Sequence, residues 1–230
     1  MLCLKRPEAI DKQAWNAQVA DLAANLTADT FACSFAVNDS DVADAHLLEM
    51  KFTQHPNDAV LSIWVEHAYD LENVYAKARE LGELQAYAVS ESAALPNRFK
   101  VGRVEGMCQI AWIKRPETQT VTDWLNAWLG NHTKVAIDTQ STFGYRQNVI
   151  ATALPLNRPE PAKWPLMDAI VEENFPAIAM TSREAFFAAE GDAEKFERHQ
   201  QVMMQSCANF IDFECFDCVP MSQYVLKEFG

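Results

Sequence analysis

The second half of the chain alternates between the two hydrophobic spacings that distinguish strands from helices. Gly106–Ile113 is a mostly apolar run of the length expected for a strand buried on both faces. From Val121 to His132 the apolar residues recur at helical spacing, and Thr120 or Thr122 can cap the first turn of this helix. Phe143–Leu154 then predicts a second strand.

The remaining segments complete a unit of six elements. Asp168–Phe175 predicts a third strand, and Ser182 or Thr181 opens a short helix. Asp192 begins a further helix, and Phe210–Val219 closes the unit as a fourth strand. The resulting order is β-α-β-β-α-β, the ferredoxin-like arrangement.

The first half repeats this plan. Lys5-Arg6-Pro7 recurs as Lys114-Arg115-Pro116, and the same spacing relates Trp15 to Trp124 and Ala23 to His132. The elements expected here are a strand, a helix, a strand and one extra strand, at Leu2–Leu4, Asp11–Leu26, Phe31–Val37 and His46–Phe52. Residues 96–105 have the composition of a connector. The expected domains are therefore residues 1–96 and residues 105–230.

Two such units solve each other's packing problem. A four-stranded sheet covers one face with its helices and leaves the other apolar face in need of a partner. We therefore expect an α+β fold in which tandem ferredoxin-like repeats pack sheet against sheet as a pseudo-dimeric α+β barrel. The space between the sheets is the natural place for a small ligand. The barrel is expected to be complete within one chain, and a homodimer of such chains is left open.

Composition and charge narrow the range of partners. The 230 residues are 49% hydrophobic, enough to bury a sizeable core, and the formal net charge is −13. So acidic a chain disfavours nucleic acid and anionic membrane surfaces, which attract clustered Lys and Arg. No apolar run approaches the roughly 20 residues that span a bilayer, and the N-terminus lacks the apolar stretch of a signal peptide. We expect a cytoplasmic protein.

Metal and nucleotide cofactors are not expected. The six cysteines are scattered without the dense spacing of a disulfide scaffold, so we expect reduced thiols. Cys215 and Cys218 have CxxC spacing, but residues three apart in a strand point to opposite faces and are poorly placed to share a metal. No other set of His, Asp or Glu has a recognisable ligand spacing, and the seven glycines form no phosphate-binding loop.

His132 is the leading candidate for chemistry. Imidazole titrates near neutrality, so a half-buried histidine can move a proton to or from an enolisable or phenolic substrate. The structural alternative is a histidine at a helix end, bonded to a backbone carbonyl. On the third predicted strand, Asp168, Ile170, Glu172 and Asn174 share one face. If that face looks into the barrel, Glu172 orients His132 or holds a substrate hydroxyl.

Aromatic and polar residues near the second predicted strand are the candidate substrate contacts. Tyr145 and Asn148 have opposite strand parity, so at most one faces the cavity, and the aromatic body and polar tip of Tyr145 favour it. Trp128 and Trp112 are either walls of an aromatic pocket or ordinary core residues. Asp168 completes the predicted substrate-binding set.

These residues also carry a family resemblance. Trp128, Asn131-His132-Thr133 and the later Tyr145-Arg146-Gln147-Asn148 resemble the signature of EthD-like proteins, in which a helix ends in W-x-x-x-H and a strand opens with Y-x-Q-N. Asp168, Glu172 and Phe175 are similar to the family's third-strand pattern. The resemblance covers roughly residues 106–225 and is weak over 1–96, where Ala23 replaces the histidine. It implies the dimeric α+β barrel superfamily, here with both units fused.

The resemblance also implies a class of ligand: hydrophobic, aromatic or polyketide-like small molecules. The leading expectation is a cofactor-independent, catabolic enzyme of lyase, isomerase, cyclase or oxygenase type, in which His132 and Glu172 assist proton transfer. One alternative is a non-catalytic small-molecule binder or an accessory subunit of a degradative oxygenase system. The other is a haem-binding barrel with His132 as the axial ligand.

Overall fold

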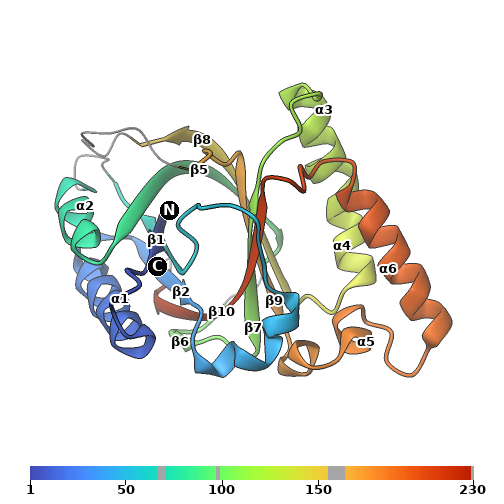
Figure 1. The fold of residues 1–230 in the computed structure, drawn as a ribbon, viewed down its shortest axis with the longest axis horizontal. Helices are drawn as coiled ribbons and strands as arrows, with labels where there is room; N and C mark the ends of the chain where they lie inside the picture. The colour runs from blue at the N-terminus through green and yellow to red at the C-terminus, as the bar shows by residue number, and fades with distance from the viewer. Residues whose placement is uncertain (67–70, 97–98, 155–163, 229–230) are drawn as a thin grey trace.

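The computed structural model describes residues 1–66, 71–96, 99–154 and 164–228. Figure 1 shows a strand barrel with helices α1 and α2 outside one half and helices α3 to α6 outside the other. The elements of the first half are β1 Leu2–Lys5, α1 Lys12–Leu26, η1 Thr27–Asp29, β2 Ala32–Val37, η2 Ser40–Leu48, β3 Met50–Lys51, β4 Ala59–Trp64, α2 Leu71–Glu80 and β5 Glu83–Leu95. Those of the second half are β6 Gly102–Arg103, β7 Met107–Ile113, α3 Val121–Leu125, η4 Asn126–His132, α4 Thr133–Thr139, β8 Gly144–Ala153, β9 Ala169–Phe175, η5 Ala177–Met180, α5 Arg183–Phe186, α6 Ala193–Cys207 and β10 Phe216–Lys227.

Eight strands of the described chain close into an antiparallel barrel. Their order is β2-β4-β1-β5-β8-β9-β7-β10, and β10 pairs with β2 to complete the ring. The protein is therefore a mixed α+β fold built on a closed barrel. The two sheets face each other across the barrel and also share edges at the β5–β8 and β2–β10 seams. Joining the edges pairs backbone groups that an open sheet would leave exposed.

Most of the predicted elements of both halves are confirmed, and so are their starting residues. Asp11, Thr120, Ser182 and Asp192 each cap a helix by accepting a hydrogen bond from the backbone amide three residues later. Such caps satisfy an amide that the first helical turn leaves without a partner. The sequence signal for where these helices begin was therefore local and sufficient.

Two predicted strands are wrong in their bounds. The predicted strand Phe210–Val219 begins only at Phe216 and runs on to Lys227, because Asp212 first makes a turn in which it accepts the amides of Glu214 and Cys215. In the extra strand predicted at His46–Phe52, residues 46–48 belong instead to the 3₁₀ segment η2, which Asp39 caps by accepting the amide of Asp41. Only β3 remains of it.

The two copies of the Lys-Arg-Pro segment fold in the same way. The amides of Arg6 and Arg115 each donate to a carboxylate, Asp58 in the first half and Asp168 in the second, at 2.9 Å in both. Both guanidinium groups donate to carbonyls of the following loop. Trp15 and Trp124 each donate their indole N–H to a distant backbone carbonyl, at Leu81 and Phe210. Equivalent residues therefore fix equivalent turns in the two halves.

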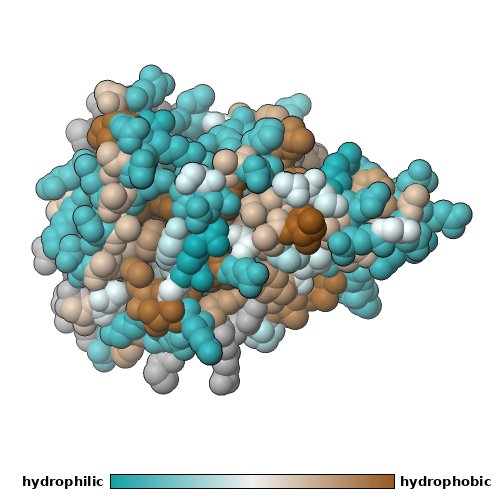
Figure 2. Space-filling view, turned by 90° about the horizontal axis from the view of Figure 1, so that it is seen from below, coloured by the Kyte–Doolittle hydropathy of each residue, from teal (hydrophilic) through white to brown (hydrophobic). Residues whose placement is uncertain are grey.

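The hydrophobic core has three parts that follow from this architecture. One lies between the first half's sheet and its helices, one between the second half's sheet and its helices, and one inside the barrel. On the face shown in Figure 2, polar residues cover most of the area and hydrophobic residues form separate patches between them. No helix within the described ranges is both long enough and apolar enough to cross a membrane.

Candidate active site

The two faces of strand β9 divide the predicted site residues between two compartments. Ala169, Val171 and Phe175 belong to the core under the helices, whereas Ile170 belongs to the core inside the barrel. Successive strand residues alternate between faces, so Glu172 points into the barrel and Glu173 points toward the helices. The prediction that Glu172 faces the barrel interior is confirmed as a placement.

Glu172 and His132 consequently lie on opposite sides of the second sheet. His132, Trp128 and Tyr145 are together on the helix side, whereas Glu172, Asn148 and Trp112 are on the barrel side. The expectation that Glu172 orients His132 is wrong, because the helix carrying His132 packs outside the barrel. The opposite orientations predicted for Tyr145 and Asn148 are confirmed, but the preference for Tyr145 as the residue that faces the space between the sheets is wrong, because Asn148 faces that space and Tyr145 lies under the helices.

The helix that carries His132 contains an irregular turn. Residues 121–139 are continuously helical, but Asn126–His132 forms a π-helical segment between α3 and α4. Gly130 lies within the π-helical segment. The equivalent α1 of the first half is regular throughout. π-Helical turns insert a residue and are frequent at functional sites.

The imidazole of His132 is enclosed between α6 and the following loop. Its Nδ1 lies 2.9 Å from Ser206 Oγ, and its ring centre lies 4.5 Å from that of Phe210. Burial lowers the pKa of His132 to about 4, because the interior solvates the charged imidazolium poorly. The histidine is therefore neutral at physiological pH. Its partner is a serine hydroxyl rather than the backbone carbonyl of the structural alternative.

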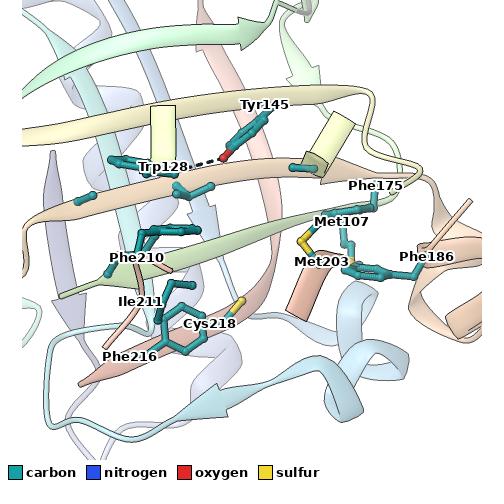
Figure 3. Close-up of a cluster of buried hydrophobic side chains, with 14 of the residues drawn as sticks. Met107, Trp128, Tyr145, Phe175, Phe186, Met203, Phe210, Ile211, Phe216 and Cys218 are labelled. Atoms are coloured by element: carbon teal, nitrogen blue, oxygen red, sulfur yellow. Dashed lines mark hydrogen bonds between the residues drawn. The ribbon is translucent and has the colours of Figure 1, made fainter. Parts of the chain in front are cut away.

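Tyr145 connects the helix to the sheet. Its hydroxyl oxygen accepts hydrogen bonds from Trp128 Nε1 at 3.3 Å, as Figure 3 shows, and from Gln147 Nε2 at 3.2 Å. Gln147 also donates to Thr133 Oγ1 at 2.9 Å. Burial is the main reason why the pKa of Tyr145 is raised, so the phenol stays protonated.

Replacing Tyr145 by phenylalanine should destabilise the protein. Trp128 and Gln147 would lose a buried acceptor, which costs about 1–3 kcal/mol of unfolding free energy. Urea unfolding monitored by circular dichroism would measure the change. Tyr75→Phe on α2 is the matched control, because no hydrogen bond of the Tyr75 hydroxyl is present within the described residues. Equal losses in the two variants would contradict this role of Tyr145.

Glu173 is the residue that the sequence analysis missed. In register it pairs with Tyr145 on β8 and with Gln109 on β7, at the centre of the sheet face that the helices cover. Its Oε1 is enclosed and has no hydrogen-bond partner within the described residues. Burial raises the pKa of Glu173 to about 8. A carboxyl group that is neutral or ionised with similar ease near neutral pH is suited to acid–base chemistry.

The sequence did contain a signal for Glu173. Ala169, Val171, Glu173 and Phe175 share one strand face, on which the carboxyl group is the only charged member. A single carboxyl group on an otherwise apolar face must be buried with the core, where its ionised form is costly. The prediction of catalytic and binding residues was instead based on the opposite, polar face of this strand, which carries Asp168, Glu172 and Asn174.

The space around Glu173 is not completely filled. Ala111 and Glu173 lie on central strands and point toward the helices, yet both keep part of their surface accessible. The core on this side of the sheet is hydrophobic, and Figure 3 shows Met107, Phe175, Phe186, Met203, Phe210 and Cys218 among its side chains. Burial raises the pKa values of the Cys207 and Cys218 thiols, and the nearby negative charge of Glu173 raises them further. Glu173 is thus an acid in a largely apolar core, and its Oε1 has no partner among the residues that the structure describes.

The equivalent compartment of the first half contains no such groups. Ala23 stands where the second half has His132, and the register of β2 with β4 places Cys33 opposite Ile63, as Tyr145 stands opposite Glu173. Ala23, Cys33 and Ile63 all pack into the apolar core of the first half. The polar groups of the second half are therefore additions to a packing scheme that does not need them.

Inside the barrel, Arg146 is held by two carboxylates. It lies 3.1 Å from Glu172 and 3.5 Å from Glu91, and its guanidinium stacks over the ring of Trp64 at 5.4 Å. Glu172 also accepts a hydrogen bond from Ser62 of the first half at 3.2 Å. This cluster joins the two halves across the barrel. Trp112 lies in the apolar part of the interior and donates to the Cys3 sulfur at 3.4 Å, as expected for an ordinary core residue rather than for the wall of a pocket.

The carboxylate of Asp168 binds two neighbouring residues of the chain. It accepts the Arg115 amide and lies 3.0 Å from Lys114 Nζ. Its proposed contact with substrate stays a prediction.

Asp168→Ala should lower the unfolding free energy by about 1–3 kcal/mol, because a charged hydrogen bond is lost. Asp58→Ala should lower the unfolding free energy by a similar amount, because Asp58 accepts the Arg6 amide in the same way. Asp138→Ala, at an exposed position, is the control and should have little effect. Thermal unfolding of the three variants would show whether the two turns are equivalent.

Comparisons with known proteins leave function to be argued from these residues. No family model matches the chain, and no curated protein matches it. A solved structure of an anthrone oxidase-like protein is similar to 97% of this chain and 88% of its own, with 10% identity and a TM-score of 0.48. Within the described ranges, no group of three or more His, Cys, Asp or Glu side chains could hold a metal ion.

Proposed function

We propose that this protein is an enzyme that moves a proton on a hydrophobic, aromatic small molecule held between the second half's sheet and its helices. The observation that carries the proposal is Glu173, an acid with a pKa of about 8 whose enclosed Oε1 finds no hydrogen-bond partner in the described part of the chain. A fold that needs only packing at this position places isoleucine there, as the first half does with Ile63. Stability alone does not explain the acid.

In this proposal Glu173 is the proton acceptor. With a pKa of about 8, roughly a tenth of the carboxyl groups are ionised at pH 7, and the anion is a much stronger base than an ordinary glutamate. His132 serves as a neutral hydrogen-bond donor to the oxygen on which negative charge develops, because its low pKa makes it a weak base. Tyr145 positions Trp128 against the bound ring. The step needs no cofactor.

Two finer assignments belong to the same proposal. We infer that the halves are fused ferredoxin-like units, which the matching turns of Arg6 and Arg115 support. We also infer membership of the EthD-like family. The support is that its two signature segments touch, because Trp128 of the helix and Gln147 of the strand both donate to Tyr145.

The haem alternative does not fit the residues as they stand. An axial histidine needs an imidazole nitrogen that faces a large open volume. The His132 side chain is only 6% exposed, its Nδ1 is taken by Ser206, and Phe210 covers its ring. A binder without turnover is the remaining alternative, and a direct assay of proton transfer separates it from an enzyme.

Deuterium exchange into an enolisable aromatic ketone tests the proposal. Anthrone is a suitable probe, because its methylene protons are acidified by two aromatic rings and a conjugated carbonyl. Wild-type protein in D₂O should accelerate exchange at this carbon, followed by NMR under nitrogen. Glu173→Gln should reduce the enzymatic rate by about 10²–10⁴-fold, since glutamine accepts no proton. Exposed Glu117→Gln is the control. Binding of anthrone without faster exchange would favour the binder and sink the enzyme.

A further inference from the structure

The two ring nitrogens of His132 have different surroundings. Nδ1 lies 2.9 Å from Ser206 Oγ. Nε2 makes no hydrogen bond with the described residues, yet it is not one of their fully enclosed polar atoms, so a bound molecule can reach it. A neutral imidazole carries one N–H hydrogen, and the nitrogen that carries it donates while the other accepts. The position of this hydrogen therefore decides whether Nε2 donates to a ligand or accepts from it.

The surroundings of His132 favour the neutral imidazole. The residue is only 6% exposed, and Phe210 covers its ring. Burial lowers its pKa to about 4, and within the described chain no carboxylate is hydrogen-bonded to the ring to oppose this effect. Only the two neutral tautomers therefore need to be distinguished at physiological pH.

The hydroxyl of Ser206 is directed at His132 rather than at its own helix. Thr133 and Thr139 each donate their hydroxyl hydrogen to the carbonyl four residues earlier, a common arrangement in helices. Ser206, near the end of α6, makes no such bond within the described residues, and His132 Nδ1 is its partner there. If Nδ1 carried the hydrogen, the serine would accept it and its own hydroxyl hydrogen would have no acceptor in that part of the chain. If Ser206 donates, both groups are paired.

Helix stability does not account for a serine at position 206. Serine is a poorer helix former than alanine, because its hydroxyl competes for backbone hydrogen bonds. The hydroxyl of Ser206 is not used to cap α6, whose N-terminal cap is Asp192. Its contact with His132 is the feature that an alanine would lose.

We propose that Ser206 is a positioning residue, whose hydroxyl donates to His132 Nδ1 and keeps the imidazole hydrogen on Nε2, where it can bond to the oxygen of a bound molecule. The tautomer follows from the contacts of the two side chains, whereas its use in catalysis rests on the proposed function. When Glu173 takes the proton from substrate carbon, the electron pair of that C–H bond moves toward the substrate oxygen. The Nε2 hydrogen of His132 then stabilises the charge on that oxygen. Ser206 acts only through the imidazole.

Nitrogen-15 NMR of the imidazole tests the tautomer directly. Two-bond proton–nitrogen correlation spectra distinguish the protonated from the bare ring nitrogen, and the signals lost in His132→Asn identify this residue among the five histidines. Wild-type protein should carry the hydrogen on Nε2. Ser206→Ala should give the averaged signals of two tautomers, and Ser206→Thr, which keeps the hydroxyl, should restore the wild-type pattern. Gln205→Ala, at the exposed preceding position of α6, is the control.

Deuterium exchange into anthrone measures the consequence for catalysis. Ser206→Ala should lower kcat about tenfold, because the donor to the developing charge is then present in only part of the molecules. The KM for anthrone should stay nearly unchanged, since Ser206 is not a substrate contact in this proposal. Ser206→Thr should recover most of the rate, and Gln205→Ala should match the wild type. Circular dichroism establishes that each variant is folded before the assay.

Three results would overturn the proposal. The first is a wild-type imidazole with its hydrogen on Nδ1, and the second is a wild-type NMR pattern that persists in Ser206→Ala. The third is an unchanged kcat of Ser206→Ala when the wild type is active. A wild-type protein that does not accelerate exchange would instead refute the proposed function, and the NMR spectra would still decide whether Ser206 fixes the tautomer.

Discussion

The difference in unfolding free energy between wild-type protein and Glu173→Gln should change by several kcal/mol between pH 4.5 and pH 9. Burial raises the pKa of Glu173 to about 8 in the folded state, against an ordinary value of 4.5 in the unfolded chain. The folded state therefore favours the protonated form. Its contribution to stability is complete below pH 4.5 and is lost as the pH rises through 8. The shift corresponds to about 3–5 kcal/mol.

Urea unfolding at half-unit pH intervals would measure this difference. Glutamine resembles the protonated acid in shape and does not ionise, so the variant should be the more stable protein above pH 8 and similar to wild type near pH 5. Exposed Glu117→Gln controls for the general effect of one fewer negative charge on an acidic chain. A wild-type minus variant difference that stays constant with pH would show that Glu173 titrates normally.

Arg146→Met should be the most destabilising single substitution inside the barrel. Removing the guanidinium leaves Glu172, which is 3% exposed, without its charged partner, and weakens the link to Glu91. An uncompensated buried charge costs about 3–5 kcal/mol. Adding Glu172→Met to Arg146→Met should recover most of that loss, because the double variant buries no unpaired charge at this position. Arg198→Met on the exposed surface is the control.

A double-mutant cycle in guanidinium or urea would measure the coupling between these two residues. If Arg146→Met and Glu172→Met destabilise additively, the ion pair is not what holds the barrel centre. A strong coupling would instead show that the two halves are joined at this point by charge, since Ser62 of the first half also donates to Glu172.

Much of the fold was predictable because its signals are local. Caps such as Asp11 and Thr120 mark helix starts within a few residues, and the apolar runs of β7 and β9 have the length of buried strands. The closing of the barrel was harder to predict from the sequence. It depends on β5 pairing with β8 and β10 with β2, which no short stretch of sequence specifies.

The site was predictable only in part, because strand parity separates neighbours in sequence. The prediction assigned chemistry to Glu172, one residue away from Glu173, and that single step moves a side chain to the other side of the sheet. Trp128 and Tyr145 contact each other because a helix and a strand bring them together on one side of the sheet, and His132 lies on that same side; their roles toward a substrate stay a prediction. The π-helical turn before His132 has no clear sequence signal beyond Gly130.

The seam between β2 and β10 also sets the order in which the molecule can form. Val37 and Ser222 are partners in this seam, so a strand from early in the chain waits for nearly the last strand to be synthesised. Until then β2 keeps an open edge, and β5 keeps one until β8 is synthesised, so their backbone groups are free to pair with other chains. Contacts this distant in sequence slow folding. The closed barrel therefore covers both edges of the first half's sheet, but only after a long interval during synthesis in which an exposed edge can pair with another copy of the chain.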